Sequence, residues 1–242
     1  MIKQKNIIIN ENAYGESQSS LRYWENHRNK LDDLYPSERY FLEPALKNAK
    51  STLDVGCAGG GSYNFCKEAN PDIDYTGIDI SKPLLDIAKK SHPKGNFSQY
   101  NGHFIPFSKN RFDLVFSIGV LHHLNHWQNM ILQMVKCSSK LSVFDLRLTE
   151  RDTLADADKY YQKVTFDNKW DERTAITYIV VNIEEFVRFL KRNFSDGAYR
   201  IESYGYFAKP TKLANVPYNK VFMCCIKIEK NSYSPGIFVE IK

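Results

Sequence analysis

The sequence has no apolar run that approaches the length of a membrane-spanning helix, which argues against an integral membrane protein. The apolar part of its first ten residues is too short for a secretory signal peptide. Its five cysteines are unevenly spaced and include no C-x-x-C pair, which favours reduced thiols over a disulfide framework. We therefore expect a cytoplasmic protein without membrane association.

Clusters of basic residues are also missing. The net charge is +5, but the positive residues are scattered and the only short basic run is Lys89-Lys90. Such a surface is compatible with anionic substrates or RNA, yet scattered charge is typical of a solvated surface, so we expect no nucleic-acid partner. The length of 242 residues and the hydrophobic content of 43% suit one large α/β domain.

The most informative segment is residues 53–61, where an acid, Asp54, and a glycine-rich turn follow a short apolar run. Glycine adopts positive φ and lets a ligand approach the main chain without meeting a Cβ atom. Asp79 lies at the end of a second apolar strand. Its carboxylate can accept hydrogen bonds from both hydroxyls of a ribose. Ser81 can cap the following helix, which leaves Asp79 for a ligand.

Two further segments complete a series: residues 101–107, Asn-Gly-His-Phe-Ile-Pro-Phe, and residues 112–124, which end in Leu-His-His-Leu. In this order the four segments resemble the class I S-adenosylmethionine-dependent methyltransferases, in particular the small-molecule, methyltransferase type 11/25-like branch. The resemblance runs from about residue 51 to residue 142. It implies S-adenosylmethionine as the cofactor.

The resemblance also assigns roles to the first two segments. In this family the DxGxGxG turn wraps the methionine end of the cofactor, and here Asp54, Gly56 and Gly60 match it, while Ala58 replaces the middle glycine. The ribose-binding acid of the family falls on Asp79.

The remaining cofactor contacts implied by the resemblance come from four residues. Ile80 follows the ribose-binding acid and is expected beside the cofactor. Asn101 stands where the family has an Asp that binds the adenine amino group, and its amide oxygen can accept the same hydrogen bond. Gly102 would offer its backbone N–H to the adenine ring, and Ser117 would hold the methionine end.

A dinucleotide-binding Rossmann domain is the main competing interpretation, because the same turn reads as GxAxxG and is followed by an acid. The acid at Asp54, however, would crowd a pyrophosphate with like charge. The segments of Asn101 and Ser117 have no counterpart in dehydrogenases, and the rest of the chain offers no hydride-transfer domain. These points favour the methyltransferase interpretation.

Apolar runs and turn signals predict the order of the elements. We expect strands at residues 51–55, 74–78, 96–100, 112–117, 141–146, 199–207 and 221–228. We expect helices at residues 62–69, 82–91, 125–137 and 183–193, the last capped by Asn182. This alternation predicts an α/β fold with a doubly wound, Rossmann-like, seven-stranded sheet that is mostly parallel and has an antiparallel C-terminal edge hairpin.

Two regions outside the motifs are expected to select the substrate. Residues 1–50 form an N-terminal helical lid or substrate segment that carries Tyr14 and Trp24, and residues 51–242 form the Rossmann-like methyltransferase domain. Within that domain, residues 149–181 are expected to form a substrate-covering insertion, rich in aromatic residues that include Trp170 and Tyr178.

His122 and His123 follow the fourth strand, where the donor methyl group should lie. Either imidazole can act as a general base near neutrality, and His123 is preferred; a packing or capping role for them remains the alternative. His122 and His126 are one helical turn apart, which invites a zinc interpretation, but no carboxylate or cysteine lies near to complete a site, so we expect no metal.

The function expected from these features is methyl transfer from S-adenosylmethionine to a small polar metabolite, for example a sugar, by O- or N-methylation. An RNA or protein methyltransferase on the same scaffold is one alternative, and it should show a recognition domain or a dense basic face. A non-catalytic, S-adenosylmethionine-binding subunit is another.

Overall fold

The computed structural model describes residues 8–15, 18–164, 174–195, 198–232 and 234–241. Three parts of the two regions expected to select the substrate lie outside these described residues: residues 1–7 and 16–17 of the N-terminal segment, and residues 165–173, with Trp170, of the insertion. No helix in the described part of the chain is long and apolar enough to cross a membrane.

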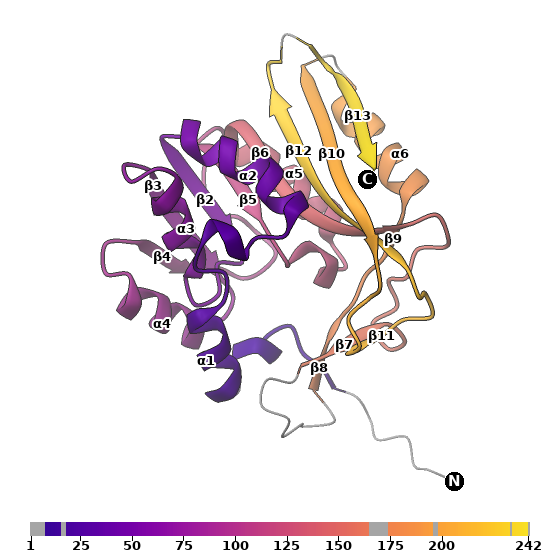
Figure 1. Cartoon of the computed structure of the whole chain (residues 1–242), viewed down its shortest axis with the longest axis horizontal. Helices are drawn as coiled ribbons and strands as arrows, with labels where there is room; N and C mark the ends of the chain where they lie inside the picture. Colours follow the sequence, from indigo (N-terminus) through magenta and orange to yellow (C-terminus); the bar gives the residue numbers. More distant parts are fainter. Residues whose placement is uncertain (1–7, 16–17, 165–173, 196–197, 233, 242) are drawn as a thin grey trace.

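The centre of the molecule is a sheet of nine strands, counted over the described residues. Their bounds are β2 (Ser51–Val55), β3 (Asp74–Asp79), β4 (Asn96–Gln99), β5 (Phe112–Ser117), β6 (Ser138–Thr149), β9 (Val181–Asn182), β10 (Tyr199–Ala208), β12 (Val221–Lys230) and β13 (Gly236–Ile241). Eight of them follow the order β13-β10-β12-β6-β5-β2-β3-β4, and β9 pairs with the end of β6 (Figure 1). Strand β12 is antiparallel to β6 and β10, while the other pairs in the sheet are parallel.

The predicted fold class is confirmed, and all seven predicted strands are present. The expected C-terminal hairpin consists of β10 and β12, but β12 lies between β6 and β10, and the edge of the sheet is β13, which the sequence analysis did not predict. Strand β9 was also missed, because two residues are too few to show a periodicity.

A second, four-stranded sheet has the order β1-β8-β7-β11. It combines short strands from distant parts of the chain: β1 (Ile8–Ile9), β7 (Tyr161–Lys163), β8 (Thr174–Thr177) and β11 (Ala214–Asn215). In Figure 1, β7, β8 and β11 lie together below the ends of β10 and β12. The N-terminal segment and the predicted insertion therefore belong to one substructure, which no local pattern in the sequence indicates.

Helices cover both faces of the central sheet. Their bounds are α1 (Gln18–Asn26), α2 (Pro36–Asn48), α3 (Gly61–Ala69), α4 (Lys82–Ser91), α5 (Trp127–Cys137) and α6 (Ile183–Phe194), with short 3-10 helices at Ala13–Gly15, Leu31–Asp33 and Leu121–His123. One hydrophobic cluster packs Met130 of α5 and Phe186 of α6 against the strands, and a second packs α2, α3 and α4 through Leu42, Phe65 and Leu85. Two separate apolar layers make the sheet doubly wound.

Helix α6 illustrates how local sequence sets these elements. The side-chain oxygen of Asn182 accepts the backbone N–H groups of Glu184 and Glu185 at 2.9 and 3.0 Å, as expected for the predicted N-cap. The buried side of the helix carries Phe186, Phe189 and Leu190, which confirms the predicted apolar stripe.

The N-terminal segment packs directly on the glycine-rich turn. A Cβ atom on Gly59 would lie 2.6 Å from the carbonyl oxygen of Trp24, and one on Gly61 would lie 2.2 Å from that of His27. Both glycines are therefore required for close approach of main chain to main chain. A Cβ on Gly15 would similarly lie 2.1 Å from the Ser81 hydroxyl oxygen.

We expect Gly61→Ala to loosen the N-terminal segment, because its new methyl group can only be accommodated by moving the backbone at His27. The free energy of unfolding should fall by about 1 to 3 kcal/mol, the usual cost of overpacking. Urea unfolding measures the loss, and hydrogen exchange should show faster exchange in α1. Lys191→Ala, at an exposed position of α6 away from this contact, is the control. An unchanged stability and exchange pattern in Gly61→Ala would contradict this packing.

Candidate active site

The glycine-rich turn after β2 has three residues with positive φ: Gly56 at 86°, Ala58 at 45° and Gly60 at 84°. The backbone N–H groups of Gly56 and Cys57 both donate to the carbonyl oxygen of Ile78, at 2.8 and 3.1 Å, so the turn bends over the end of β3. Ala58 is the one of the three with a Cβ atom, and the left-handed conformation costs such a residue about 1 to 2 kcal/mol. Surrounding contacts must offset that cost.

Asp79 supplies one of those contacts. Its Oδ2 accepts the Ala58 N–H at 2.9 Å, and its Oδ1 accepts the Ser81 N–H at 2.8 Å. Burial raises the pKa of Asp79, and the backbone donors act in the opposite direction. The expectation that Asp79 is left entirely for a ligand is therefore wrong, although Ser81 does cap α4 through the Leu84 N–H. Each carboxylate oxygen keeps a second lone pair.

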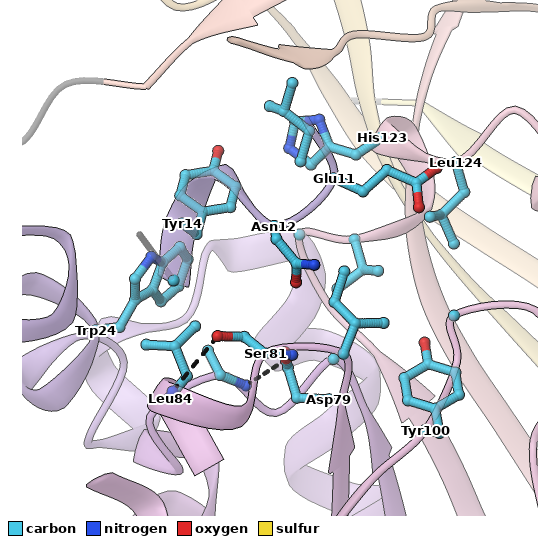
Figure 2. A pocket seen from close by; sticks show the side chains of 18 of the residues that line it. Glu11, Asn12, Tyr14, Trp24, Asp79, Ser81, Leu84, Tyr100, His123 and Leu124 are labelled. Atoms are coloured by element: carbon cyan, nitrogen blue, oxygen red, sulfur yellow. Dashed lines mark hydrogen bonds between the residues drawn. The ribbon is translucent and has the colours of Figure 1, made fainter. Parts of the chain in front are cut away.

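An apolar hollow beside these residues is here named the donor cavity; it has an empty volume of about 780 Å³, including space open to solvent. Five of the predicted cofactor residues line it: Gly56, Ala58, Asp79, Ile80 and Gly102. Figure 2 shows Tyr14 and Trp24 on one side of it and Tyr100 on the other, with Asp79 and His123 at opposite ends. Tyr14 and Trp24 were expected in the segment over the methyl donor, whereas Tyr100, Glu11, Asn12 and Gly15, which also line the cavity, were not predicted.

Two predicted residues, Asn101 and Ser117, do not line the donor cavity. The side-chain oxygen of Asn101 accepts the N–H groups of His103 and Phe104 at 3.0 and 2.8 Å, so it closes its own turn. The Ser117 hydroxyl is fully buried and donates to the Val55 carbonyl at 2.8 Å. The neighbouring Gly102, Ile118 and Gly119 face the cavity in their place.

Asp54 lies in an adjoining pocket, which has an empty volume of about 410 Å³ and also contains Trp24 and Arg28. Its Oδ2 accepts the Tyr75 hydroxyl at 2.8 Å, and burial raises the pKa of Asp54 to about 7. Gly60 lines neither space; it starts α3, and a Cβ there would lie 2.9 Å from the Cβ of Ala88. Its role is close packing of α3 against α4.

His123 is buried at the far end of the donor cavity. Its Nδ1 lies 2.5 Å from the carbonyl oxygen of Thr177, and because a carbonyl only accepts, Nδ1 carries the proton and Nε2 has the free lone pair. Burial lowers the pKa of His123 to about 4, which the hydrogen bond to Thr177 partly opposes. The imidazole is therefore neutral at physiological pH and can accept a proton at Nε2.

Two other buried nitrogen atoms have no hydrogen-bond partner in the described part of the chain: Nδ1 of His122 and Nε1 of Trp24. Burial, reinforced by the neighbouring His123, lowers the pKa of His122 well below its usual value. Because an unpaired buried polar atom costs free energy, a ligand that formed a hydrogen bond to either atom would remove that cost. Among the described residues, no group of three or more His, Cys, Asp or Glu side chains could hold a metal ion.

A second large space, here named the acceptor cavity, has an empty volume of about 1280 Å³. It shares four lining residues with the donor cavity: Tyr14, Trp24, Gly119 and His123. The two cavities therefore meet at His123. The second sheet closes part of the acceptor cavity, since Gln162 and Lys163 of β7 line it.

A buried group of charges lies beneath the acceptor cavity. Arg147 pairs with Asp145 at 2.5 Å, and Asp145 also accepts the Gly119 N–H at 2.6 Å. Arg28 pairs with Glu38 at 3.0 Å, and burial raises the pKa of Glu38 to about 7. The sequence analysis missed this group; two charged residues flanking Leu146 in an otherwise apolar strand were the available signal.

Comparison with known proteins identifies a methyltransferase domain in part of the chain. Residues 53–140 match the family described as "Methyltransferase domain". The phthiotriol/phenolphthiotriol dimycocerosates methyltransferase of Mycobacterium tuberculosis is 26% identical over 89 residues, which are 36% of this chain and 33% of that protein. A tRNA (carboxymethyluridine(34)-5-O)-methyltransferase of Saccharomyces cerevisiae is 38% identical over 71 residues, 29% of this chain and 24% of that one. This chain thus spans a third or less of the length of either relative.

The fold comparison covers nearly the whole chain. The plantazolicin methyltransferase, solved in complex with SAH, superposes with a TM-score of 0.58 at 14% identity, covering 92% of this chain and 94% of that one. The predicted resemblance is therefore confirmed at the level of the domain and the fold: residues 53–140 match a methyltransferase domain, and the fold is that of solved S-adenosylmethionine-dependent methyltransferases.

Proposed function

We propose that this chain transfers a methyl group from S-adenosylmethionine to a small polar metabolite by O- or N-methylation. The observation that carries the proposal is the meeting of the donor and acceptor cavities at Tyr14, Trp24, Gly119 and His123. Methyl transfer is an in-line displacement, so a donor and an acceptor must face each other across a site that excludes water.

The donor cavity fits S-adenosylmethionine, which when bound supplies an electrophilic methyl group on a sulfonium. The free lone pairs of Asp79 can accept both ribose hydroxyls. Gly56 lines this cavity at a position without room for a side chain, because a Cβ there would lie 2.4 Å from the Val120 side chain. The indole N–H of Trp24 lacks a partner among the described residues and can donate to an oxygen of the cofactor or the acceptor.

His123 is the residue we assign as general base, and His122 is placed to bind the acceptor rather than the donor, because it lines only the acceptor cavity. The Thr177 carbonyl fixes the His123 tautomer and leaves Nε2 to take the proton of a hydroxyl as the methyl group arrives. A base whose pKa is about 4 is weak, so it suits an acidic hydroxyl. An amine acceptor needs only to be unprotonated.

The N-terminal segment and the insertion are proposed to cover the site. Residues Glu11, Asn12 and Tyr14 line the donor cavity, and Tyr178 lines the acceptor cavity. The Asn10 N–H donates to the Ala175 carbonyl at 2.9 Å, which ties the two regions together. Binding and release then require this joined cover to move.

The test of the proposal is to incubate the protein with methyl-labelled S-adenosylmethionine and a cell extract separated into small-molecule, RNA and protein fractions. Label in the small-molecule fraction supports the proposal. Label confined to RNA or protein would assign the chain to those substrates instead, and donor binding without label in any fraction would indicate a non-catalytic subunit.

We expect Asp79→Ala to weaken S-adenosylmethionine binding by about 2 to 4 kcal/mol, because two charge-assisted hydrogen bonds to the ribose would be lost. Part of the loss should come from release of the Ala58 N–H from its carboxylate partner. Calorimetric titration measures it, with Asp86→Ala, an exposed position of α4, as the control. Unchanged affinity in a folded Asp79→Ala protein would remove Asp79 from the site.

We expect His123→Ala to bind the donor nearly as well as the wild type while its turnover falls by roughly 10² to 10⁴, the usual contribution of a general base. In the wild type, turnover should fall as the pH approaches 4, because protonation of Nε2 removes the base. That acidic limb should be absent from His123→Ala and present in His122→Ala. If both variants keep near-normal turnover, the two histidines are structural.

A further inference from the structure

All the charged side chains among the described residues that line the acceptor cavity are positive. Its charged lining residues are Arg28, Arg147, Lys163 and Lys209, and no Asp or Glu is among the described residues that line it. The two carboxylates that neutralise the arginines, Glu38 and Asp145, are 1% and 2% exposed and lie behind them. A ligand in this cavity therefore meets cations first.

Arg147 is the best placed of these cations. Its side chain is 8% exposed and pairs with Asp145 through one terminal nitrogen, and a guanidinium has five N–H donors. Asp145 is itself held by the Gly119 N–H, so the arginine has a fixed position at the floor of the cavity. A fixed guanidinium favours the paired oxygens of a carboxylate or phosphate.

The uncharged lining adds hydrogen-bonding groups and flat surfaces. The unpartnered Nδ1 of His122 and Nε1 of Trp24 both belong to rings that line the acceptor cavity. The tyrosines Tyr23, Tyr35, Tyr178 and Tyr206 surround the same space. Aromatic walls with few rotatable bonds favour a flat, conjugated ligand over a bulky saturated one.

We propose that the acceptor is an anionic aromatic or conjugated molecule, whose carboxylate or phosphate binds Arg147 and whose methyl-accepting hydroxyl or amine lies at His123. This inference rests on the proposed function and narrows its substrate class away from a neutral sugar. The methyl group is transferred to the hydroxyl or amine that lies at His123, and that acceptor group gives up its proton there. The anionic group is unchanged in the product.

The labelled small-molecule fraction provides the first test. The labelled product should be retained on an anion-exchange resin at pH 7, and its label should survive mild alkali, which removes methyl esters. Phosphatase treatment then separates the two sources of negative charge, because only a phosphate monoester loses its retention. A labelled product that passes through the resin would overturn the anionic acceptor and leave the proposed function intact, whereas absence of label from the small-molecule fraction would overturn both.

Substitutions of Arg147 provide the second test. The substrate for these assays is the unmethylated acceptor, identified from the labelled product. Asp145→Asn/Arg147→Met removes both members of the buried pair, so no unpaired charge is left in the core. Its KM for the acceptor should rise about 10- to 100-fold, the loss expected for hydrogen bonds to a charged group. The single variant Arg147→Lys keeps a positive charge, so its KM for the acceptor should lie between those of the wild type and the double variant.

Lys209→Gln tests the same idea at an exposed position whose substitution leaves the core intact. The KM should rise about 2- to 5-fold and the rise should disappear at high salt, as for a screened surface charge. Arg188→Met, on the outer face of α6, is the control and should match the wild type. An acceptor KM unchanged in both the double variant and Lys209→Gln would contradict the assigned anion site.

Discussion

The hydrogen bonds of the Asp79 carboxylate are the interaction on which the rest of the site depends. They connect the end of β3 to the glycine-rich turn through Ala58 and to the start of α4 through Ser81. A buried carboxylate needs such donors, because burial raises its pKa and disfavours its charge. The same donors hold the turn in the left-handed conformation that Ala58 resists. A ribose diol would add two donors to a carboxylate that is already in position.

Glycines serve two different purposes around this carboxylate. Gly56 lines the donor cavity at a position without room for a side chain. Gly59 and Gly61 instead allow the carbonyls of Trp24 and His27 to approach, so they fix the cover over the site. A single glycine-rich segment thus shapes the cavity floor and positions the residues that close it. The indole of Trp24, which lines both cavities and the pocket of Asp54, is held in place by this packing.

The parts of the structure that local sequence determines were predictable. Strands β2 to β6 and the cap of α6 follow from short patterns whose physical cause is local. Gly56, Asp79 and Gly102, to which the family resemblance assigns cofactor contacts, line the donor cavity, and those contacts stay a prediction. Asn101 and Ser117, to which the same resemblance assigns cofactor contacts, do not line the donor cavity, because a motif gives the neighbourhood of a ligand but not which of two adjacent residues faces it. Both instead satisfy backbone groups of their own turn or sheet.

The acceptor side was not predictable to the same degree. The second sheet closes part of it through β7, and the strands of that sheet are two to four residues long and pair across large sequence separations. Arg147 and Glu38 are close only because α2 packs on the face of β6 where Asp145 and Arg147 lie. The tautomer of His123 depends on a carbonyl 54 residues away in the chain. Such contacts join residues that are far apart in the sequence, so the spacing of apolar residues along the chain does not predict them.

A crystal structure of the protein with S-adenosylhomocysteine is the most direct test of the claim that methyl donor and acceptor meet at His123. The account predicts ribose hydroxyls within hydrogen-bond distance of the Asp79 carboxylate, and a sulfur atom that faces His123 at the junction of the two cavities. Ribose bound away from Asp79, or a sulfur atom directed away from the acceptor cavity, would contradict it.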